Sequence, residues 1–583
     1  MTYNIHSHLA ALFLSCALCA ASLVSPLSSF RASANVPAGT SAESSPVPAM
    51  PAASSDALLL DRLQRECFLY MWQHAYPSGM TFENNRYEDG PATIGGTGFG
   101  VSAIVVAVER GWIPRGQAVE RLLTLTRFLR DKTARKSLHG AFPHWVNGIT
   151  GETMPFGVKD IGADIVETAF LMQNLLIARE YFNGVGPEEE LRATITRLWE
   201  DVEWDWFAAG PGGRQKPENN GMYWHWSPEY GFEMNMKVSG FNECLALYVM
   251  ALASPTHPIP REAYAYWKST DEYRPKSGNG YTVEAAMPYT GPLFITHYSF
   301  IGIDPFRIAD DRVRRGYGVR NVTQTLVNRA YCLESAPKEY GYRESLWGLT
   351  SCDAPEGYTF NAPGNEHGVI APTAALSSMP YAPYYAMQVL RELYGPQEKD
   401  MVGPWGPYDS LRPALDPAKR WYARTYNAID QLPIVCMVEN YRSGLLWNLF
   451  MRTEEARRGL ERAGMTEPEL PTGFPEMVIT LKPASDGATD RYVPDACDLP
   501  LHPDHRAFEV RYRADADAAA SFSLRDARGN TLWAAATNAR RGANTLSIPP
   551  LAPGAADKEE RLILSMKMGG VTHELPVRLR GKM

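Results

Sequence analysis

The sequence of 583 residues lacks the features that mark most nucleic-acid-binding and membrane proteins. Acidic residues outnumber basic ones, 65 to 57, and the formal net charge is −8. A nucleic-acid-binding surface needs clustered Lys and Arg to neutralise phosphates, so we expect no nucleic-acid partner. Beyond the first residues no apolar run is long enough to cross a bilayer, and we therefore expect no membrane span.

The signature motifs of several enzyme classes are also absent. The sequence contains no GxSxG elbow of a serine hydrolase and no GxxxxGK[ST] phosphate-binding loop. The Gly-rich segment 95–100 (GGTGFG) follows no strand-like run, which argues against a dinucleotide site. No HExxH motif and no clustered spacing of metal ligands occurs, so we expect neither a cofactor nor a metal.

Cysteine is scarce, with eight residues, of which two lie in an apolar run near the N-terminus. The other six are widely spaced and form no CxxC pair. Cys332 and Cys352 could form a disulfide in an oxidising compartment, and buried free thiols are the alternative.

The N-terminal segment has the composition of an export signal. Residues 9–24 are apolar, too few to span a bilayer comfortably, and Ala32-Ser33-Ala34 offers one cleavage site. We therefore predict a signal peptide over 1–34 and a flexible Ala/Ser/Pro-rich tether over 35–56. A secreted or periplasmic protein is expected, and a lipoprotein is disfavoured because no convincing lipobox is present.

Helical patterns follow one another through residues 57–470, separated by loops rich in Gly, Pro and Asn. Helices without strands, joined by long motif-bearing loops, predict a mainly α fold of the (α/α) toroid type around a central cavity. A helical solenoid is the alternative, although no fixed repeat period is visible. The predicted helices are 58–74, 98–110, 115–130, 160–181, 187–207, 242–253, 322–332, 371–394 and 443–457.

The last part of the chain, 471–583, alternates apolar and polar residues between turn signals. This pattern predicts a C-terminal antiparallel β-sandwich domain that carries no obvious catalytic cluster. Its expected role is packing against the toroid, and glycan binding is the less favoured alternative. The predicted strands are 507–514, 520–525, 531–536, 544–548, 561–566 and 572–578.

Three carboxylates recur at helical spacing in the segment 158–176. Asp160, Asp164 and Glu167 stand at i, i+4 and i+7, which would place them on one face of a helix among apolar neighbours. Crowded carboxylates raise at least one pKa, as a general acid requires. The alternative is that Asp160 caps the helix and the others meet basic partners.

Two further acids are candidates. Glu243 opens an apolar helix after the turn 240–242, where Asn242 is the expected N-cap, and a helix-dipole role is as consistent with this spacing as catalysis. Asp430 precedes a buried-looking run and is by itself a weak signal. Two carboxylates across a cleft are what glycoside hydrolysis requires.

Loops rich in His, Trp and Tyr surround these acids in the sequence. With 14 Trp and 29 Tyr, the chain has flat aromatic faces with polar edges that suit sugar rings, although many would also fill a helical core. The substrate-binding candidates are His144, Trp145, Trp224, Trp226, His297 and Trp347.

Seven segments, taken in order, resemble the glycoamylase-like proteins of glycoside hydrolase family 144. The resemblance covers nearly the whole helical region and leaves out the C-terminal strands. The segments are TGFGVSAIVVAVERGWI, HGAFPHW, DIGADIVETAFLMQNLL, GFNECLALYVMALASPTHPI, GPLFITHYSFIGID, ESLWGLTSCDAPEGY and IDQLPIVCMVENYRSGLLW.

The resemblance implies an (α/α)6 toroid and a glycoside hydrolase that acts on β-1,2-glucan, usually endo-acting and inverting. It places functional acids at the five candidate positions, with Glu243 as the general acid and either Asp430 or, second, Asp164 as the base. The expected partner is a β-glucan polysaccharide or oligosaccharide. An exo-acting enzyme that releases sophorose and a noncatalytic glycan-binding envelope protein remain the alternatives.

Overall fold

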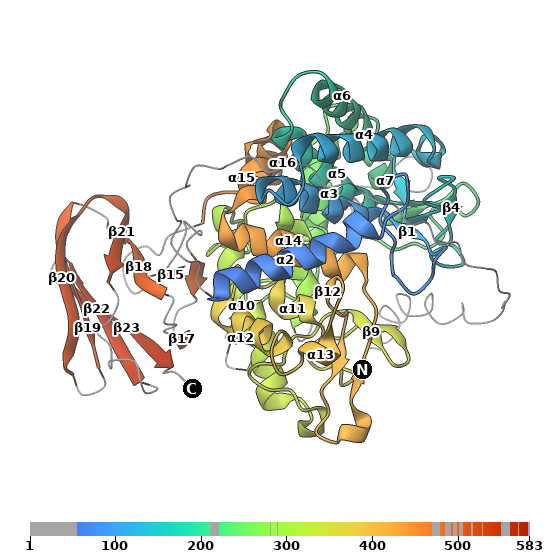
Figure 1. The fold of residues 1–583 in the computed structure, drawn as a ribbon. Helices are drawn as coiled ribbons and strands as arrows, with labels where there is room; N and C mark the ends of the chain where they lie inside the picture. Colours follow the sequence, from blue (N-terminus) through green and yellow to red (C-terminus); the bar gives the residue numbers. More distant parts are fainter. Residues whose placement is uncertain are drawn as a thin grey trace, which may run out of the picture.

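The computed structural model describes residues 55–209, 221–279, 281–287 and 290–468, and after them a set of strands between 478 and 580 (Figure 1). The predicted signal peptide lies outside the described residues. So does the predicted tether, except for its last two residues, which begin helix α2 (Ser55–Gln73). Within the described part, no helix combines the length and apolar character that crossing a membrane requires.

The region up to residue 468 is predominantly helical, and its helices differ in how much of their surface is buried. α3, α5, α8 and α14 are buried along nearly their whole length, as expected of helices in the interior. The amphipathic helices α4, α6 and α16 pack against α3, α5 and α8, respectively, and the amphipathic α12 packs against α11. The helices of eight residues or more after α2 are α3 (Ile94–Glu109), α4 (Arg115–Asp131), α5 (Ile165–Tyr181), α6 (Pro187–Glu200), α8 (Leu245–Ala253), α10 (Tyr317–Ala330), α12 (Pro383–Leu393), α14 (Ala428–Arg442), α15 (Leu445–Arg452) and α16 (Glu454–Ala463).

Shorter helices occupy the connections between the long ones. They are α7 (Trp204–Ala209), α9 (Arg261–Trp267), α11 (Pro372–Leu376) and α13 (Glu398–Met401).

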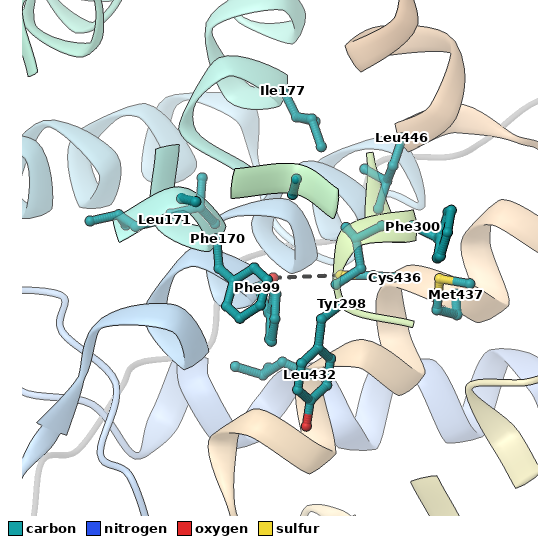
Figure 2. Close-up of a cluster of buried hydrophobic side chains, with 14 of the residues drawn as sticks. Phe99, Phe170, Leu171, Ile177, Tyr298, Phe300, Leu432, Cys436, Met437 and Leu446 are labelled. Atoms are coloured by element: carbon teal, nitrogen blue, oxygen red, sulfur yellow. Dashed lines mark hydrogen bonds between the residues drawn. The ribbon is translucent and has the colours of Figure 1, made fainter. Parts of the chain in front are cut away.

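The inner helices pack closely because small residues lie where they cross. Gly98 of α3 faces α5, and a Cβ added there would lie 2.7 Å from Cα of Leu171. In Figure 2, Phe99 and Phe170 from these two helices meet Tyr298, with ring centroids 5.1–5.7 Å apart, beside Cys436 of α14. This cluster joins elements far apart in sequence directly behind the site described below.

Short strands connect the helices and were not evident in the sequence, because two or three residues cannot show a period of two. The sheet β2-β5-β6 matters most, since it crosses from one loop to the next beside the N-terminus of α5. The strands are β1 (Ala92–Thr93), β2 (Phe142–Pro143), β3 (Trp145–Val146), β4 (Thr153–Met154), β5 (Ala163–Asp164), β6 (His225–Trp226), β7 (Lys276–Gly278), β8 (Tyr281–Val283), β9 (Cys352–Ala354), β10 (Gly357–Thr359), β11 (Val402–Gly403), β12 (Gly406–Pro407), β13 (Leu411–Arg412) and β14 (Trp421–Tyr422).

The C-terminal strands form two sheets, in the orders β16-β15-β18-β21 and β17-β23-β22-β19-β20. Pairings are antiparallel except for β17 with β23. One apolar cluster takes residues from both sheets, and Tyr512 of β18 contacts Phe522 of β19, with ring centroids 5.0 Å apart. The strands are β15 (Val478–Pro483), β16 (Arg491–Val493), β17 (Asp498–Pro500), β18 (His505–Ala514), β19 (Ala518–Arg525), β20 (Thr531–Ala539), β21 (Gly542–Ile548), β22 (Glu560–Met568) and β23 (Val571–Arg580).

The cysteines of the described region are free thiols. Cys332 and Cys352 are both buried and unbridged, which settles the two alternatives left by the sequence in favour of free thiols. Burial raises the pKa of the Cys332 thiol to about 12, so it is protonated and unreactive at neutral pH.

Candidate active site

A cavity opens where the first turns of α5 and α14 and the segment before α8 come together. Carboxyl groups and aromatic rings line it, and Phe170 and Tyr298, which belong to the hydrophobic cluster of Figure 2, are among the lining residues. The lining residues are His144, Phe156, Asp160, Asp164, Glu167, Phe170, Trp224, His225, Met234, Met236, Glu243, Phe294, Tyr298, Ser351, Tyr358 and Ile429.

Asp164 is the N-cap of α5 and holds two histidines at the same time. Its Oδ1 accepts hydrogen bonds from the N–H groups of Val166 and Glu167, at 2.9 and 3.0 Å. Its Oδ2 lies 3.0 Å from Nδ1 of His144 and 3.7 Å from Nε2 of His225. The sheet β2-β5-β6 explains this convergence, since Asp164 pairs across it with Phe142 on one side and His225 on the other.

Asp164 forms ion pairs with His144 and His225. Burial opposes ionisation of Asp164, but the hydrogen bond from His144 and the charge of His225 lower the pKa of the carboxyl below its ordinary value. Burial likewise opposes charge on His144, yet Glu167 and Asp164 raise its pKa to about 10. At neutral pH the pair is therefore a carboxylate and an imidazolium.

Asp160 corrects the prediction of three carboxylates on one helical face. The helix begins at Ile165 rather than at residue 160, because Asp164 ends a strand and caps the helix. Asp160 lies in the preceding loop, where its Oδ2 is 3.2 Å from Nε2 of His225. The alternative that Asp160 caps the helix is also wrong, since Asp164 does so. All three acids nevertheless reach the same cavity.

Glu167 lies in the first turn of α5, and its Oε2 accepts the N–H of Gly95 at 2.6 Å. Only glycine leaves room for this contact, since a Cβ at residue 95 would lie 2.5 Å from that oxygen. Burial is the main cause of its raised pKa; His144 opposes the rise, and the charges of Asp164 and Glu83 add to it, giving about 8. Glu167 is therefore largely protonated at neutral pH.

Glu243 precedes α8, which begins at Leu245 with Cys244 at the N-cap position. The predicted N-cap, Asn242, instead accepts hydrogen bonds from the Cys244 N–H and from Nε1 of Trp267, at 3.1 and 3.2 Å. Ser299 donates a hydrogen bond to the main-chain oxygen of Glu243. Burial, reinforced by the charge of Asp164, raises the pKa of the Glu243 carboxyl to about 7.

A second group of acids lies behind the cavity wall and includes Asp430, which is only 3% exposed. The Tyr358 hydroxyl donates to Oδ2 of Asp430 at 3.3 Å. Burial, reinforced by the neighbouring carboxyl of Asp409, raises the pKa of Asp430 well above its ordinary value. The Asp353 N–H donates to Oδ2 of Asp409 at 2.7 Å, which fixes that carboxyl in place.

The predicted substrate-binding residues divide into two sets. His144 and Trp224 line the cavity. Trp145, Trp226, His297 and Trp347 do not lie among its lining residues. Trp145 packs edge-on behind Phe156, at 4.8 Å between centroids, and Trp226 packs against the imidazole of His139.

His297 and Trp347 are core residues, each 1% exposed. Nε2 of His297 lies 2.9 Å from the Ser378 hydroxyl, and that hydroxyl donates to the main-chain oxygen of Ala374, so the imidazole is the donor. Burial lowers the pKa of His297 to about 3, which keeps it neutral. In the sequence His297 lies in a polar-aromatic loop, and this position does not distinguish a core residue from a cavity residue.

Several lining residues were missed in the sequence. Phe156 stacks on His144, with centroids 3.9 Å apart, and Tyr358 lies in the hairpin β9-β10. His225 stands between Trp224 and Trp226, both predicted to bind substrate, and this neighbourhood is the one signal in the sequence that could have identified it. Nothing in the sequence distinguished Asp409 or Glu83 from surface acids.

One group in the described part of the chain brings metal-ligating atoms together, within 4.8 Å of one another: His144, Asp160 and Asp164. A histidine that binds a metal must be a neutral imidazole with a free lone pair. With its pKa at about 10, His144 carries a proton on both nitrogens at neutral pH, and a metal would have to displace one of these protons.

Comparison with known proteins connects this site to one group of enzymes. A family model named Glycoamylase matches residues 235–454. The exo β-1,2-glucooligosaccharide sophorohydrolase (non-reducing end) of Parabacteroides distasonis is 36% identical over 432 residues, which cover 70% of this chain and 58% of that protein. The chain therefore spans little more than half the length of that relative.

Two solved structures extend the comparison. The endo-β-1,2-glucanase of Chitinophaga pinensis, solved with sophorotriose and glucose, is 41% identical with a TM-score of 0.66, covering 71% of this chain and 100% of its own. A β-1,2-glucanase structure from Parabacteroides distasonis is 35% identical with a TM-score of 0.66, covering 71% and 61%. With a relative this similar matched over its whole length, the chain belongs to the glycoamylase-like proteins of glycoside hydrolase family 144.

Proposed function

We propose that the protein is a glycoside hydrolase that cleaves β-1,2-glucan, acting within the chain and with inversion of configuration. One observation carries the proposal: Glu243, with a pKa near 7, faces a cavity that holds further carboxyl groups and aromatic rings. A carboxyl that is partly protonated at neutral pH is what a general acid needs. The names of the relatives supply the linkage.

In the proposed reaction Glu243 donates its proton to the glycosidic oxygen as the bond breaks. Asp430 is our first choice for the base that receives the proton of the attacking water, and Asp164 is the second. The structure favours Asp430, because Asp164 is already bound by two histidines and its lowered pKa makes it a weak base. Asp160 and Glu167 would then bind sugar hydroxyls, while Trp224 and Phe156 offer faces for the rings.

An exo-acting enzyme that releases sophorose is the second candidate, since the Parabacteroides distasonis relative carries that activity in its name. A noncatalytic glycan-binding protein is the third candidate, and the raised pKa of Glu243 favours an enzyme over it, since perturbed acids cluster at active sites. Both alternatives differ from the first in what they release from the polymer.

We also propose a domain organisation for the chain. The buried inner and amphipathic outer helices support an (α/α)6 toroid over 57–470, and the apolar cluster shared by two sheets supports a β-sandwich over 471–583. The composition of the first residues supports export to the periplasm or the medium.

The test is to incubate the purified protein with β-1,2-, β-1,3- and α-glucans and to resolve the products by size. An endo-acting enzyme gives a ladder of oligosaccharides from β-1,2-glucan and leaves the other polymers intact. Sophorose as the sole early product would support the exo alternative. Intact β-1,2-glucan after long incubation would contradict both enzymatic proposals.

A further inference from the structure

Asp430 is separated from the cavity by one side chain. Asp430 is 3% exposed and is not a cavity-lining residue, whereas the adjacent Ile429 lines the cavity. Tyr358 does line the cavity, and its hydroxyl donates to Oδ2 of Asp430. A water in the cavity therefore reaches Asp430 by way of this hydroxyl.

The hairpin β9-β10 holds Tyr358 in this position. Tyr358 pairs with Asp353 across the hairpin, and the Asp353 side chain accepts hydrogen bonds from Arg86, at 3.2 Å, and from the Thr425 hydroxyl. The tyrosine residue is 38% exposed, so its ring is wetted by the cavity while its hydroxyl points inward. Tyr358 thus joins solvent and a buried acid.

Behind Asp430, Asp409 gives the carboxyl a partner. Burial raises the pKa of both carboxyl groups, and the charge of Asp353 adds to the rise at Asp409 as that of Asp409 does at Asp430, so the neighbouring pair shares one proton near neutral pH. Such a pair accepts one further proton, because the shared proton shifts to Asp409 when a new one reaches Oδ2 of Asp430. Glu83 and Asp353 add negative charge around the pair, which strengthens its attraction for a proton.

We propose that Tyr358 is a catalytic residue that relays the proton of the attacking water to Asp430. The water oxygen bonds to the anomeric carbon, its proton passes to the oxygen of Tyr358, and the phenolic proton passes to Oδ2 of Asp430. At the same time Glu243 gives its proton to the departing sugar oxygen. One proton leaves Glu243 and one arrives at the Asp409–Asp430 pair, so the protons balance, and solvent restores both groups. This inference rests on the proposed function.

The competing role for Tyr358 is that of a ring on which a sugar stacks. The two roles separate in Tyr358→Phe, which keeps the ring and removes the hydroxyl. A relay predicts that kcat falls by about 10²-fold or more while KM changes little, the usual magnitude for loss of general acid–base catalysis. A stacking role predicts a nearly unchanged kcat, which would overturn the inference.

The matched control is Tyr331→Phe. The Tyr331 hydroxyl also donates to a carboxylate, Oε2 of Glu366 at 2.9 Å, but the residue does not line the cavity. We expect wild-type kinetics for this variant. Equal unfolding temperatures of the two variants and wild type would show that the Tyr358→Phe effect is not a loss of folding.

Azide gives a second readout, since this anion attacks carbon without needing a base. Added azide should restore cleavage by Tyr358→Phe and yield a glucosyl azide of α configuration. No azide product, together with a raised KM, would overturn the relay in favour of a binding role.

If Tyr358→Phe does not fold, 3-fluorotyrosine at position 358 keeps the hydroxyl and makes it more acidic. An unaltered pH profile of kcat would then contradict the relay.

The double variant Tyr358→Phe with Asp430→Asn completes the test. Two groups that act in series on one proton lose activity together, so the double variant should be no slower than the slower single variant. Multiplied losses would show independent roles and contradict the relay. Wild-type protein that leaves every glucan intact would instead reject the proposed function, so the two failures are distinguishable.

Discussion

At the scale of single residues, the cavity separates its carboxyl groups by their pKa. Histidines lower the pKa of Asp164, whereas burial raises that of Glu243 to about 7 and that of Glu167 to about 8. Groups of one chemical type are thereby assigned different protonation states at one pH. In the proposed function, the environment of Glu243, rather than its residue type, suits it to donate a proton.

The pH dependence of activity follows from Glu243. The carboxyl must be protonated to act as an acid, so kcat/KM should fall as the pH rises through about 7. Asp164→Asn removes a negative charge that raises this pKa, and the alkaline limb should move to lower pH. Initial rates measured across the pH range test both statements. An unmoved limb in Asp164→Asn would contradict the assignment.

His144 links stability to pH. Its pKa is about 10 in the folded protein against 6.5 for an unperturbed imidazole, so the native state binds the proton more tightly. The resulting contribution is fully present below pH 6.5 and is lost as the pH rises through about 10. The free energy of unfolding should therefore fall over this interval in wild type and fall less in His144→Gln. Parallel urea-unfolding curves for both proteins would refute this.

Sequence patterns identified the acids and missed their partners. Asp160, Asp164, Glu167 and Glu243 all line the cavity. They were predictable because acids embedded in apolar segments are unusual. The substrate-binding predictions were less specific. His297 fills the core, and an isolated tryptophan or histidine carries no signal of which side it faces. Asp409 and Tyr358 acquire their contacts only through folding, from segments distant in sequence.

At the scale of secondary structure elements, helix starts position the site. Asp164 caps α5, Glu167 lies in its first turn, and Glu243 stands just before α8. Backbone N–H groups at such positions have no partner within the helix, and the positive end of the dipole favours nearby carboxylates. The helix N-termini therefore concentrate acids that would otherwise repel one another.

Close packing of α3 on α5 predicts a contrast between two glycines. In Gly98→Ala the new Cβ would meet backbone atoms of Leu171 at 2.7–3.0 Å, so overpacking should destabilise the protein by about 1–3 kcal/mol. A Cβ added at Gly116 in α4 would have nothing within 4 Å, so Gly116→Ala should be neutral or stabilise by up to about 1 kcal/mol. Urea unfolding measures both changes. Equal effects of the two variants would contradict the packing argument.

Long periodic elements were predictable and boundaries were not. The predicted helix 115–130 and the six predicted C-terminal strands match α4, β18, β19, β20, β21, β22 and β23 to within a few residues. The predicted helix 371–394 divides into α11 and α12, because Pro380 and Pro383 interrupt it. The helix predicted from residue 160 begins only at Ile165. Strand pairing of β5 and the capping role of Asp164 exclude helical geometry before that point, although the apolar pattern continues through it.

At the scale of the whole molecule, the chain has separate hydrophobic cores. The main cluster runs through the helices, and another joins the two C-terminal sheets, with no residue in common among those described. The Chitinophaga pinensis relative is matched over its entire length by 71% of this chain. The cavity residues all belong to the helical part.

Removal of the C-terminal sheets should therefore leave the site intact. We expect a chain ending at residue 468 to fold and to keep kcat/KM for glucan within a few fold of the full-length protein. Thermal unfolding and initial rates on the two proteins provide the comparison. An aggregated or inactive truncated chain would show that the sheets support the helical part.

The most direct test of the account is the activity of Glu243→Gln on β-1,2-glucan. The variant keeps the shape of the side chain and loses its proton, so turnover should fall by about 10²–10⁴-fold while calorimetry shows oligosaccharide binding largely preserved. Glu262→Gln, an exposed acid at the start of α9, is the control and should turn over normally. Near-normal turnover by Glu243→Gln would contradict the account and move the general acid to Asp160, Asp164 or Glu167.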